Sequence, residues 1–134
     1  MEKQYAQNPA IENILTRRSV RSYTDQDVEP GKIEAILEAG MAAPSGKNGQ
    51  PWDFIVLTRR EILDEMAERL PYAKMLREAR VAIAVCADRT KSPYWYVDCS
   101  AAAENILLAA HALGLGAVWT ATYPYRDRMD VVKE

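Results

Sequence analysis

An uninterrupted apolar run from Val81 to Ala87 constrains the fold of this chain more than any other feature. Val81, Ile83 and Val85 are β-branched, and a short apolar run of this kind is typical of a buried strand. The run is far shorter than the roughly 20 residues that a membrane-spanning helix needs. The sequence therefore predicts a strand here.

Two further strands and several helices are predicted around this run. Phe54–Leu57 is a short apolar run rich in strand-forming residues, so a buried strand is expected there. Ala117–Thr120 follows Gly114 and Gly116, which favour a helix end. Helical spacing and breaker residues place helices after Asn8-Pro9, after Glu29-Pro30, after Thr58, after Pro71, after Ser92-Pro93 and from Asp127. Asn8 is expected to cap the first helix, and Thr58 with Glu61 resembles a capping box.

Apolar residues at helical spacing define the faces that these helices are expected to bury. In the first helix they are Ile11, Ile14 and Leu15. In the later helices they are Ile33, Ile36, Leu37 and Met41; Ile62, Leu63, Met66 and Leu70; Tyr72, Met75, Leu76 and Ala79; and Cys99, Ala102, Ala103, Ile106, Ala110 and Leu113. The alanine-rich stretch Ala101–Ala110 fits either a plain core helix or a helix at a dimer interface.

Length and composition indicate one packed domain. The chain has 134 residues, of which 49% are hydrophobic, so we expect a single domain over residues 1–134 rather than a disordered segment. Helices alternating with strands give an α/β or α+β sandwich. Because three strands rarely complete such a sheet, we expect the chain to stop before its domain does.

Charge and cysteine content exclude several classes of protein. The net charge is −2, without the basic excess of a nucleic-acid-binding protein. Cys86 and Cys99 are too few for a disulfide framework and are expected to be buried thiols in a reducing compartment. The stretch Met1–Ala10 is polar, unlike a signal peptide, so we expect a cytoplasmic protein without contact to membranes or nucleic acid.

The segment Arg17–Tyr23 combines three guanidinium groups with the hydroxyls of Ser19 and Ser22. Forked arginine donors match the oxygens of a phosphate. Alternatively, these arginines are solvated cations that interact favourably with the negative end of the dipole of the first helix. The added hydroxyls favour phosphate binding, because a solvated face does not require them.

The segment Pro44–Trp52 is a polar turn with two prolines, two glycines and a terminal indole. Such a loop suits a flat ring with donors and acceptors around its edge. An ordinary surface connection anchored by Trp52 fits equally well, since Ser, Gly, Asn and Pro are common in turns. Together with the arginines, the loop suggests a phosphorylated aromatic cofactor.

Groups able to catalyse a reaction by themselves are scarce. His111 is the only histidine and lies mid-helix between alanines, so a structural role is expected. No zinc-ligand spacing, Ser-His-Asp arrangement, P-loop or G-x-G-x-x-G occurs, and Gly114-Leu115-Gly116 fits a helix stop. If the protein is an enzyme, a cofactor therefore supplies the reactivity.

Three motifs resemble the FMN-dependent nitroreductase superfamily, in the order found in that family. The first is Arg17–Tyr23, the second Ala43–Phe54, and the third runs from Ala103–Ala110 to Leu113–Trp119. The resemblance covers the chain from about Ile11 to Trp119. It implies an α+β fold, a three-layer α/β/α sandwich with a central mixed or antiparallel sheet, and a homodimer with two FMN sites at the interface.

The resemblance implies three groups of FMN-binding residues. Those matching the phosphate and pyrimidine side are Arg17, Arg18, Ser19 and Arg21. Those matching the loop that reaches the flavin from the partner subunit are Pro44, Ser45, Gly46 and Asn48, with Gln50 a weaker candidate. Those matching the strand end beside the isoalloxazine ring are Trp119, Thr120 and Ala121.

The implied activity is hydride transfer from NADH or NADPH to FMN and on to a nitroaromatic, quinone or similar acceptor. No metal site and no protein acid or base is expected. A non-catalytic flavin-binding or sensing protein, and an enzyme that alters flavin or a halogenated aromatic, are the rival hypotheses. Family members continue past the third strand with a helix, a strand and a tail that adds a basic residue at the phosphate. Truncation relative to a longer protein is therefore expected here, with a divergent family member as the alternative.

Overall fold

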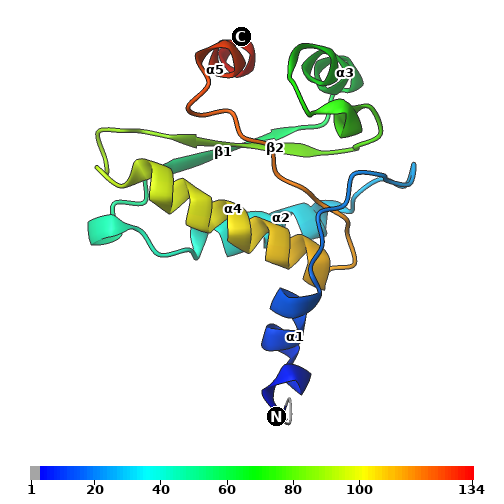
Figure 1. Ribbon diagram of the computed structural model, residues 1–134, viewed down its shortest axis with the longest axis vertical. Coiled ribbons are helices and arrows are strands. Elements are labelled where there is room, and N and C mark those ends of the chain that lie inside the picture. The colour runs from blue at the N-terminus through cyan, green and yellow to red at the C-terminus, as the bar shows by residue number, and fades with distance from the viewer. Residues whose placement is uncertain (1–3) are drawn as a thin grey trace.

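The computed structural model describes residues 4–134, so the polar stretch Met1–Ala10 is described from Gln4 onward. The helices and strands are, in chain order, η1 (Gln4–Gln7), α1 (Pro9–Thr16), α2 (Pro30–Met41), η2 (Gly46–Asn48), β1 (Trp52–Leu57), α3 (Arg60–Arg69), η3 (Lys74–Arg77), β2 (Ala82–Ala87), α4 (Trp95–Ala112) and α5 (Arg126–Lys133), where η denotes a 3-10 helix. They form three layers (Figure 1): α2 and α4 lie on one side of the strands, and α3 and α5 on the other.

The sheet is an antiparallel pair of β1 and β2, in which Trp52 lies opposite Ala87 and Leu57 opposite Ala82. Both strands were predicted from their apolar runs, but β1 is not the buried strand expected at Phe54–Leu57, because Ile55 is 51% exposed and its neighbours are only partly buried. The third predicted strand is wrong, because in the described chain Ala117 makes only an isolated parallel bridge to Ser19. Trp119 and Thr120 beyond it are exposed, so no neighbouring strand continues the pairing.

Two of the predicted helix starts are tested by their caps. The Asn8 side chain accepts hydrogen bonds from the backbone N–H groups of Ala10 and Ile11, as predicted. The capping box at Thr58 is wrong: α3 begins at Arg60, with Arg59 in the cap position and no side-chain hydrogen bond. Strand β1 runs to Leu57, so the chain is still extended at Arg59.

The core is divided between the two faces of the sheet. On the α4 side, Ala43, Trp52 and Ala102 form one buried cluster. On the α3 and α5 side, a second cluster contains Leu70, Ala73 and Met75. The buried residues of α4 are Asp98, Ala102, Leu107 and Ala110. The predicted buried face is confirmed at Ala102 and Ala110, but the prediction missed Leu107.

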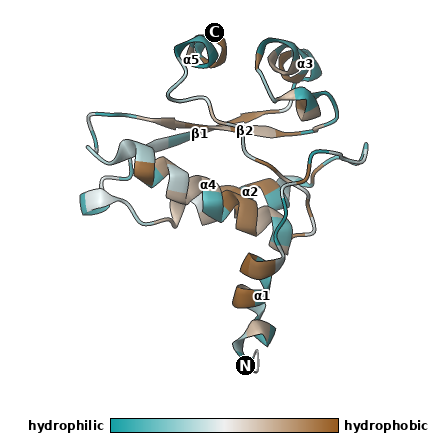
Figure 2. Cartoon of the chain, in the orientation of Figure 1, coloured by the Kyte–Doolittle hydropathy of each residue, from teal (hydrophilic) through white to brown (hydrophobic). Residues whose placement is uncertain are grey.

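The apolar stripe of α1 is exposed, contrary to prediction. Ile11, Ile14 and Leu15 are 40%, 54% and 58% exposed. Figure 1 shows α1 projecting away from the layers, and Figure 2 shows hydrophobic bands along it. Among the described residues, Asn13 and Thr16 make the side-chain hydrogen bonds from this helix to α4, while its apolar side chains remain largely open to solvent.

Other burial predictions also differ. Met41 is 52% exposed, at the end of α2. Tyr72 is 84% exposed and has a φ of 61°, so the segment after Pro71 turns outward and only the short 3-10 helix η3 follows. Cys86 and Cys99 are free thiols, as predicted, but only half-buried. Within residues 4–134, no helix has the length and apolar content required to cross a bilayer.

Candidate functional site

The arginine segment is fixed to the C-terminal half of α4. At the end of α1, the Asn13 amide donates to the Leu108 carbonyl at 2.9 Å. The Thr16 hydroxyl lies 2.9 Å from Nε2 of His111. His111 therefore makes a structural contact that orients the chain just before the arginines.

Backbone pairing then places this segment beside the residues that follow α4. The Val20 N–H donates to the Ala117 carbonyl at 3.0 Å. A Cβ on Gly116 would lie 2.7 Å from Cγ1 of Val20, so only glycine permits this approach. Gly114 has a φ of 78°, the left-handed conformation that ends α4 as predicted.

Tyr23 anchors the far end of the segment. Its hydroxyl donates to the Val20 carbonyl at 2.7 Å, and its ring packs against the core on the α5 side. Burial raises the pKa of Tyr23; the positive charge of Arg21 opposes this shift, and Glu78 adds to it. The phenol therefore stays protonated and keeps its hydrogen bond at neutral pH.

The three predicted arginines have different surroundings. Arg17 is half-buried, and its Nε lies 3.6 Å from a carboxylate oxygen of Glu104. The Arg18 guanidinium donates to the carbonyls of Leu15 and Arg17, which is the helix-end interaction considered as the alternative. Arg21 is exposed and forms no ion pair within residues 4–134.

Arg21 lines a cavity of about 330 Å³ together with the segment after α4. The full lining is Arg21, Pro71, Tyr72, Met75, Trp119, Thr120, Ala121 and Arg128. The structure thus brings together four of the predicted residues, one from the arginine segment and three from the group expected beside the isoalloxazine ring. The volume lies at the lower end of the range for small-molecule pockets.

Tyr72 and Arg128 also line this cavity, although neither was predicted from the sequence to bind the cofactor. The Arg128 guanidinium donates to the Ala121 carbonyl at 3.1 Å and lies 3.8 Å from the ring centroid of Tyr125. These contacts fix a cation at the cavity, since arginine over an aromatic face is attractive. Neither residue belongs to a recognisable motif, and only the fold brings them beside Arg21.

The Pro44–Trp52 loop forms a second group of predicted residues. The Ser45 hydroxyl accepts from the Gln50 N–H at 3.0 Å, and the Gln50 side-chain amide donates to the Asn48 side chain at 2.8 Å. Asn48 and Gln50 are exposed, whereas Trp52 is buried in the core, as an anchor should be. Polar side chains are therefore displayed on a loop whose end is fixed.

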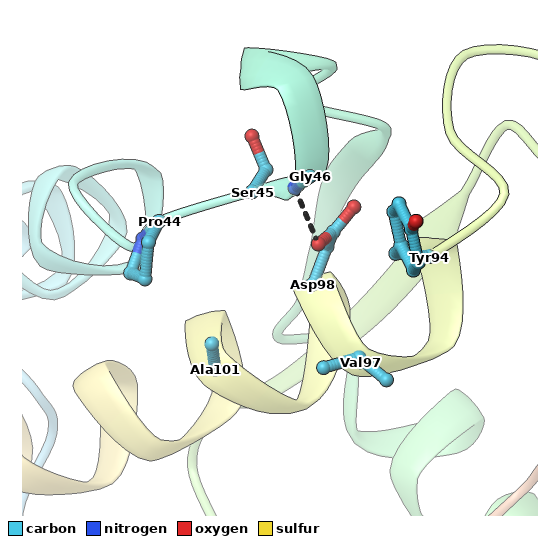
Figure 3. A pocket seen from close by; sticks show the side chains of 7 residues that line it. All are labelled: Pro44, Ser45, Gly46, Tyr94, Val97, Asp98 and Ala101. Carbon is cyan, nitrogen blue, oxygen red and sulfur yellow. Dashed lines mark hydrogen bonds between the residues drawn. The ribbon is translucent and has the colours of Figure 1, made fainter.

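An apolar hollow of about 360 Å³ lies beside this loop. Its lining residues are Pro44, Ser45, Gly46, Tyr94, Val97, Asp98 and Ala101, drawn in Figure 3. Asp98 accepts a hydrogen bond from the Gly46 N–H at 2.9 Å across this hollow.

The two groups lie at different places on α4. The loop is bonded to Asp98 in the first turn, whereas the arginine segment is fixed at His111 near the other end. Thirteen residues of helix at about 1.5 Å each separate these two anchor points by about 20 Å. Within one chain, the loop and Arg21 therefore line separate cavities.

The residues of the Arg21 cavity fit a flat, anionic ligand. Arg21 and Arg128 supply cations, and Tyr72 and Trp119 supply exposed aromatic surface. Such a donor set suits a flavin mononucleotide, whose ring stacks and whose phosphate is anionic. Within the described part of the chain, no three His, Cys, Asp or Glu side chains are grouped so that they could hold a metal ion.

Comparison with known proteins identifies the family. A family model described as "Nitroreductase family" matches residues 14–74 and 67–134. The chain therefore belongs to the nitroreductase family.

Individual relatives agree with this assignment. A Methanothermobacter thermautotrophicus protein, provisionally named NADH dehydrogenase/NAD(P)H nitroreductase, is 49% identical over 126 residues, covering 92% of this chain and 66% of the relative. A crystal structure of a Bacteroides thetaiotaomicron protein with the same provisional name has a TM-score of 0.93 and 61% identity, covering 94% of this chain and 75% of that one. These matches confirm the α+β nitroreductase-like fold.

A third relative was solved with a cofactor. It is a Desulfovibrio desulfuricans protein, provisionally called a nitroreductase, in complex with FMN. Its TM-score is 0.82 at 39% identity, covering 95% of this chain and 73% of that one.

Proposed function

We propose that this chain forms the flavin-binding domain of an FMN-dependent oxidoreductase, with residues 1–134 as one domain. The observation that carries the proposal is the cavity where Arg21 meets Trp119, Thr120 and Ala121, because two distant motifs of the sequence converge there. Bound FMN would accept a hydride from NADH or NADPH and reduce a nitroaromatic, quinone or similar acceptor. The FMN complex of the Desulfovibrio desulfuricans relative supports this cofactor.

The arginine segment would bind the anionic parts of the cofactor. Arg21 already faces the cavity, and the exposed Ser19 offers a hydroxyl donor. Arg17 would give up its 3.6 Å ion pair with Glu104, and Arg18 its hydrogen bonds to backbone carbonyls. Both would form charge-assisted hydrogen bonds to the phosphate instead. An arginine near the flavin pyrimidine would also stabilise negative charge on the reduced ring.

The loop residues Pro44, Ser45, Gly46, Asn48 and Gln50 would contact the flavin of a partner subunit. Their distance from the arginines within one chain supports a homodimer with FMN at the interface. The exposed apolar side chains of α1, Ile11, Ile14 and Leu15, also favour a partner, because large apolar patches often mark interaction surfaces. A cytoplasmic location stays a prediction.

The visible spectrum of the purified protein tests the proposal. We expect flavin absorbance, or uptake of added FMN, and bleaching by NADH or NADPH under anaerobic conditions. A colourless protein that takes up no FMN would contradict the proposal. Bound flavin that stays oxidised with both donors would support a flavin-binding or sensing protein instead, and mass spectrometry of products would reveal a flavin- or halide-processing enzyme.

The double variant R17A/R21A tests the assignment of the arginines. We expect FMN affinity to fall by at least about tenfold, since charge-assisted hydrogen bonds are lost. R59A/R126A is a matched control, because both arginines are exposed and line neither cavity. Equal affinity in the two double variants would remove the arginine segment from the site.

A further inference from the structure

The backbone of the Pro44–Trp52 loop is strained. Lys47, Asn48 and Gln50 have φ values of 54°, 54° and 44°. Residues other than glycine are seldom found in this left-handed region, and several of them in one loop persist only where the surroundings enforce the conformation. Such strain is concentrated at functional sites.

Asp98 on α4 holds this loop in place through a hydrogen bond to its backbone. Its side chain is almost fully buried, at 4% exposure. One carboxylate oxygen accepts from the Gly46 N–H at 2.9 Å, as drawn in Figure 3, and the other accepts from the Ser92 hydroxyl at 2.7 Å. Ser92 is itself 1% exposed and accepts from the Tyr94 N–H at 3.0 Å.

Close packing completes the attachment. A Cβ on Gly46 would lie 2.2 Å from Cδ2 of Tyr94, and a Cβ on Gly49 would lie 2.6 Å from the carbonyl oxygen of Lys91. The loop therefore rests directly on residues 91–98, with no space for side chains at the two glycines. Hydrogen bonds and shape together determine one position for the loop.

The chemistry of Asp98 is unusual for a simple tether. Within residues 4–134 no lysine or arginine pairs with it, so hydrogen bonds and the N-terminal end of the α4 dipole balance its charge. A buried carboxylate without a cation is costly compared with apolar packing. The hydrogen bond from the Gly46 N–H to Asp98 explains why a charged residue, rather than an apolar one, is present at this buried position.

We propose that Asp98 is a positioning residue, which holds the loop so that Ser45, Asn48 and Gln50 are preorganised for FMN. The inference rests on the proposed function. Preorganised contacts bind more tightly because less conformational entropy is lost on binding. Asp98 acts through Gly46, not by touching the cofactor.

The variants D98A, D98N and N105A test this role. Asparagine keeps an acceptor for the Gly46 N–H and can donate its amide to the Ser92 hydroxyl, whereas alanine removes both bonds. Asn105 is the matched control, because it also ties α4 to a distant backbone carbonyl, that of Ala39 at 2.9 Å, without contacting the loop. Each variant is measured for melting temperature, FMN affinity, and amide hydrogen exchange of residues 45–50 without FMN.

We expect D98A to bind FMN at least about tenfold more weakly and to exchange faster at the loop amides. D98N should stay within about threefold of the wild type, because it keeps an acceptor for the Gly46 N–H. N105A should lower the melting temperature while leaving FMN affinity and loop exchange unchanged.

Two different results would overturn the inference. D98A with wild-type FMN affinity and wild-type loop exchange would show that Asp98 does not position the loop. Equal loss of FMN affinity in D98A and N105A would assign the effect to general stability. A wild-type protein that binds no FMN would instead overturn the proposed function, and the cofactor-directed role of Asp98 with it.

Discussion

The two regions predicted to bind the cofactor are held in opposite ways. The Pro44–Trp52 loop is held by a buried carboxylate, a buried tryptophan and close contacts at Gly46 and Gly49. The Arg17–Arg21 segment is held by its backbone, while its charged groups have weak or solvent-exposed contacts. The loop is therefore held in place by its own chain, whereas we expect the arginines to be drawn together only by a bound anion.

G49A is expected to have the largest effect on stability, because it introduces a steric clash in the tightly packed loop. A Cβ at this position meets a backbone carbonyl 2.6 Å away, so the loop or residues 91–92 must shift. We expect a loss of about 1–3 kcal/mol in the free energy of unfolding, measured by urea denaturation.

G31A is the matched control for that substitution. A Cβ on Gly31 has no neighbour within 4 Å, and the residue lies in α2. Alanine there should leave stability unchanged or raise it slightly, since glycine is a poor helix former. Equal destabilisation by G31A and G49A would contradict the tight packing of the loop.

R21A should weaken FMN binding without weakening the fold. The Arg21 side chain is exposed and lines the cavity, so we expect about tenfold lower FMN affinity in a fluorescence titration and an unchanged melting temperature. R18A should change affinity less, because its guanidinium is bonded to the carbonyls of Leu15 and Arg17. The reverse ranking would show that Arg18 contributes more to FMN binding than Arg21 does.

Salt should separate the two regions further. Exposed charges are screened as ionic strength rises, while buried hydrogen bonds are not. Between about 0.05 M and about 0.5 M NaCl, we expect the FMN dissociation constant of the wild type to rise severalfold, and that of R21A to rise less. The FMN dissociation constant of D98A should rise with salt as steeply as that of the wild type, since the defect of this variant is in the loop. A weaker rise in D98A would contradict the separate roles of the loop and the arginine segment.

Thiol reactivity tests the burial of α4 and is expected to affect cofactor binding least. Burial raises the pKa of Cys99 to about 11, with the charge of Asp98 contributing. Since only the thiolate reacts, alkylation of Cys99 should be slow at neutral pH and should accelerate about tenfold per pH unit up to that value. A C86S background isolates Cys99, and a rate that levels off near pH 9, the ordinary pKa of a thiol, would show that burial does not raise its pKa.

Local sequence signals predicted those parts of the fold that depend on neighbouring residues. The Asn8 cap, the apolar run of β2, the turn at Gly114 and the burial of Ala102 are confirmed, because capping, β-branching and helical periodicity act within a few residues. The expectations that depended on distant partners were less successful. Ala117–Thr120 has strand-like composition, but a strand also needs a neighbour along its whole length.

The candidate site divides in the same way. Residues within motifs, such as Arg21 and Trp119, could be named from the sequence alone. Tyr72, Arg128 and Asp98 could not, because each gains its place through a contact with a segment far away in the chain. Their own sequence neighbourhoods, a turn, a charged helix and the start of an apolar helix, are ordinary.

By itself, the order of residues determined the family, the layered α+β architecture and the two polar segments that contain the predicted cofactor contacts. The tertiary structure decided that these segments are about 20 Å apart at their anchors on α4, that Ile11, Ile14 and Leu15 lie outside the core, and that a buried aspartate fixes the loop. Periodicity and capping are properties of short stretches, whereas burial and long-range hydrogen bonds depend on which distant surfaces meet when the chain packs.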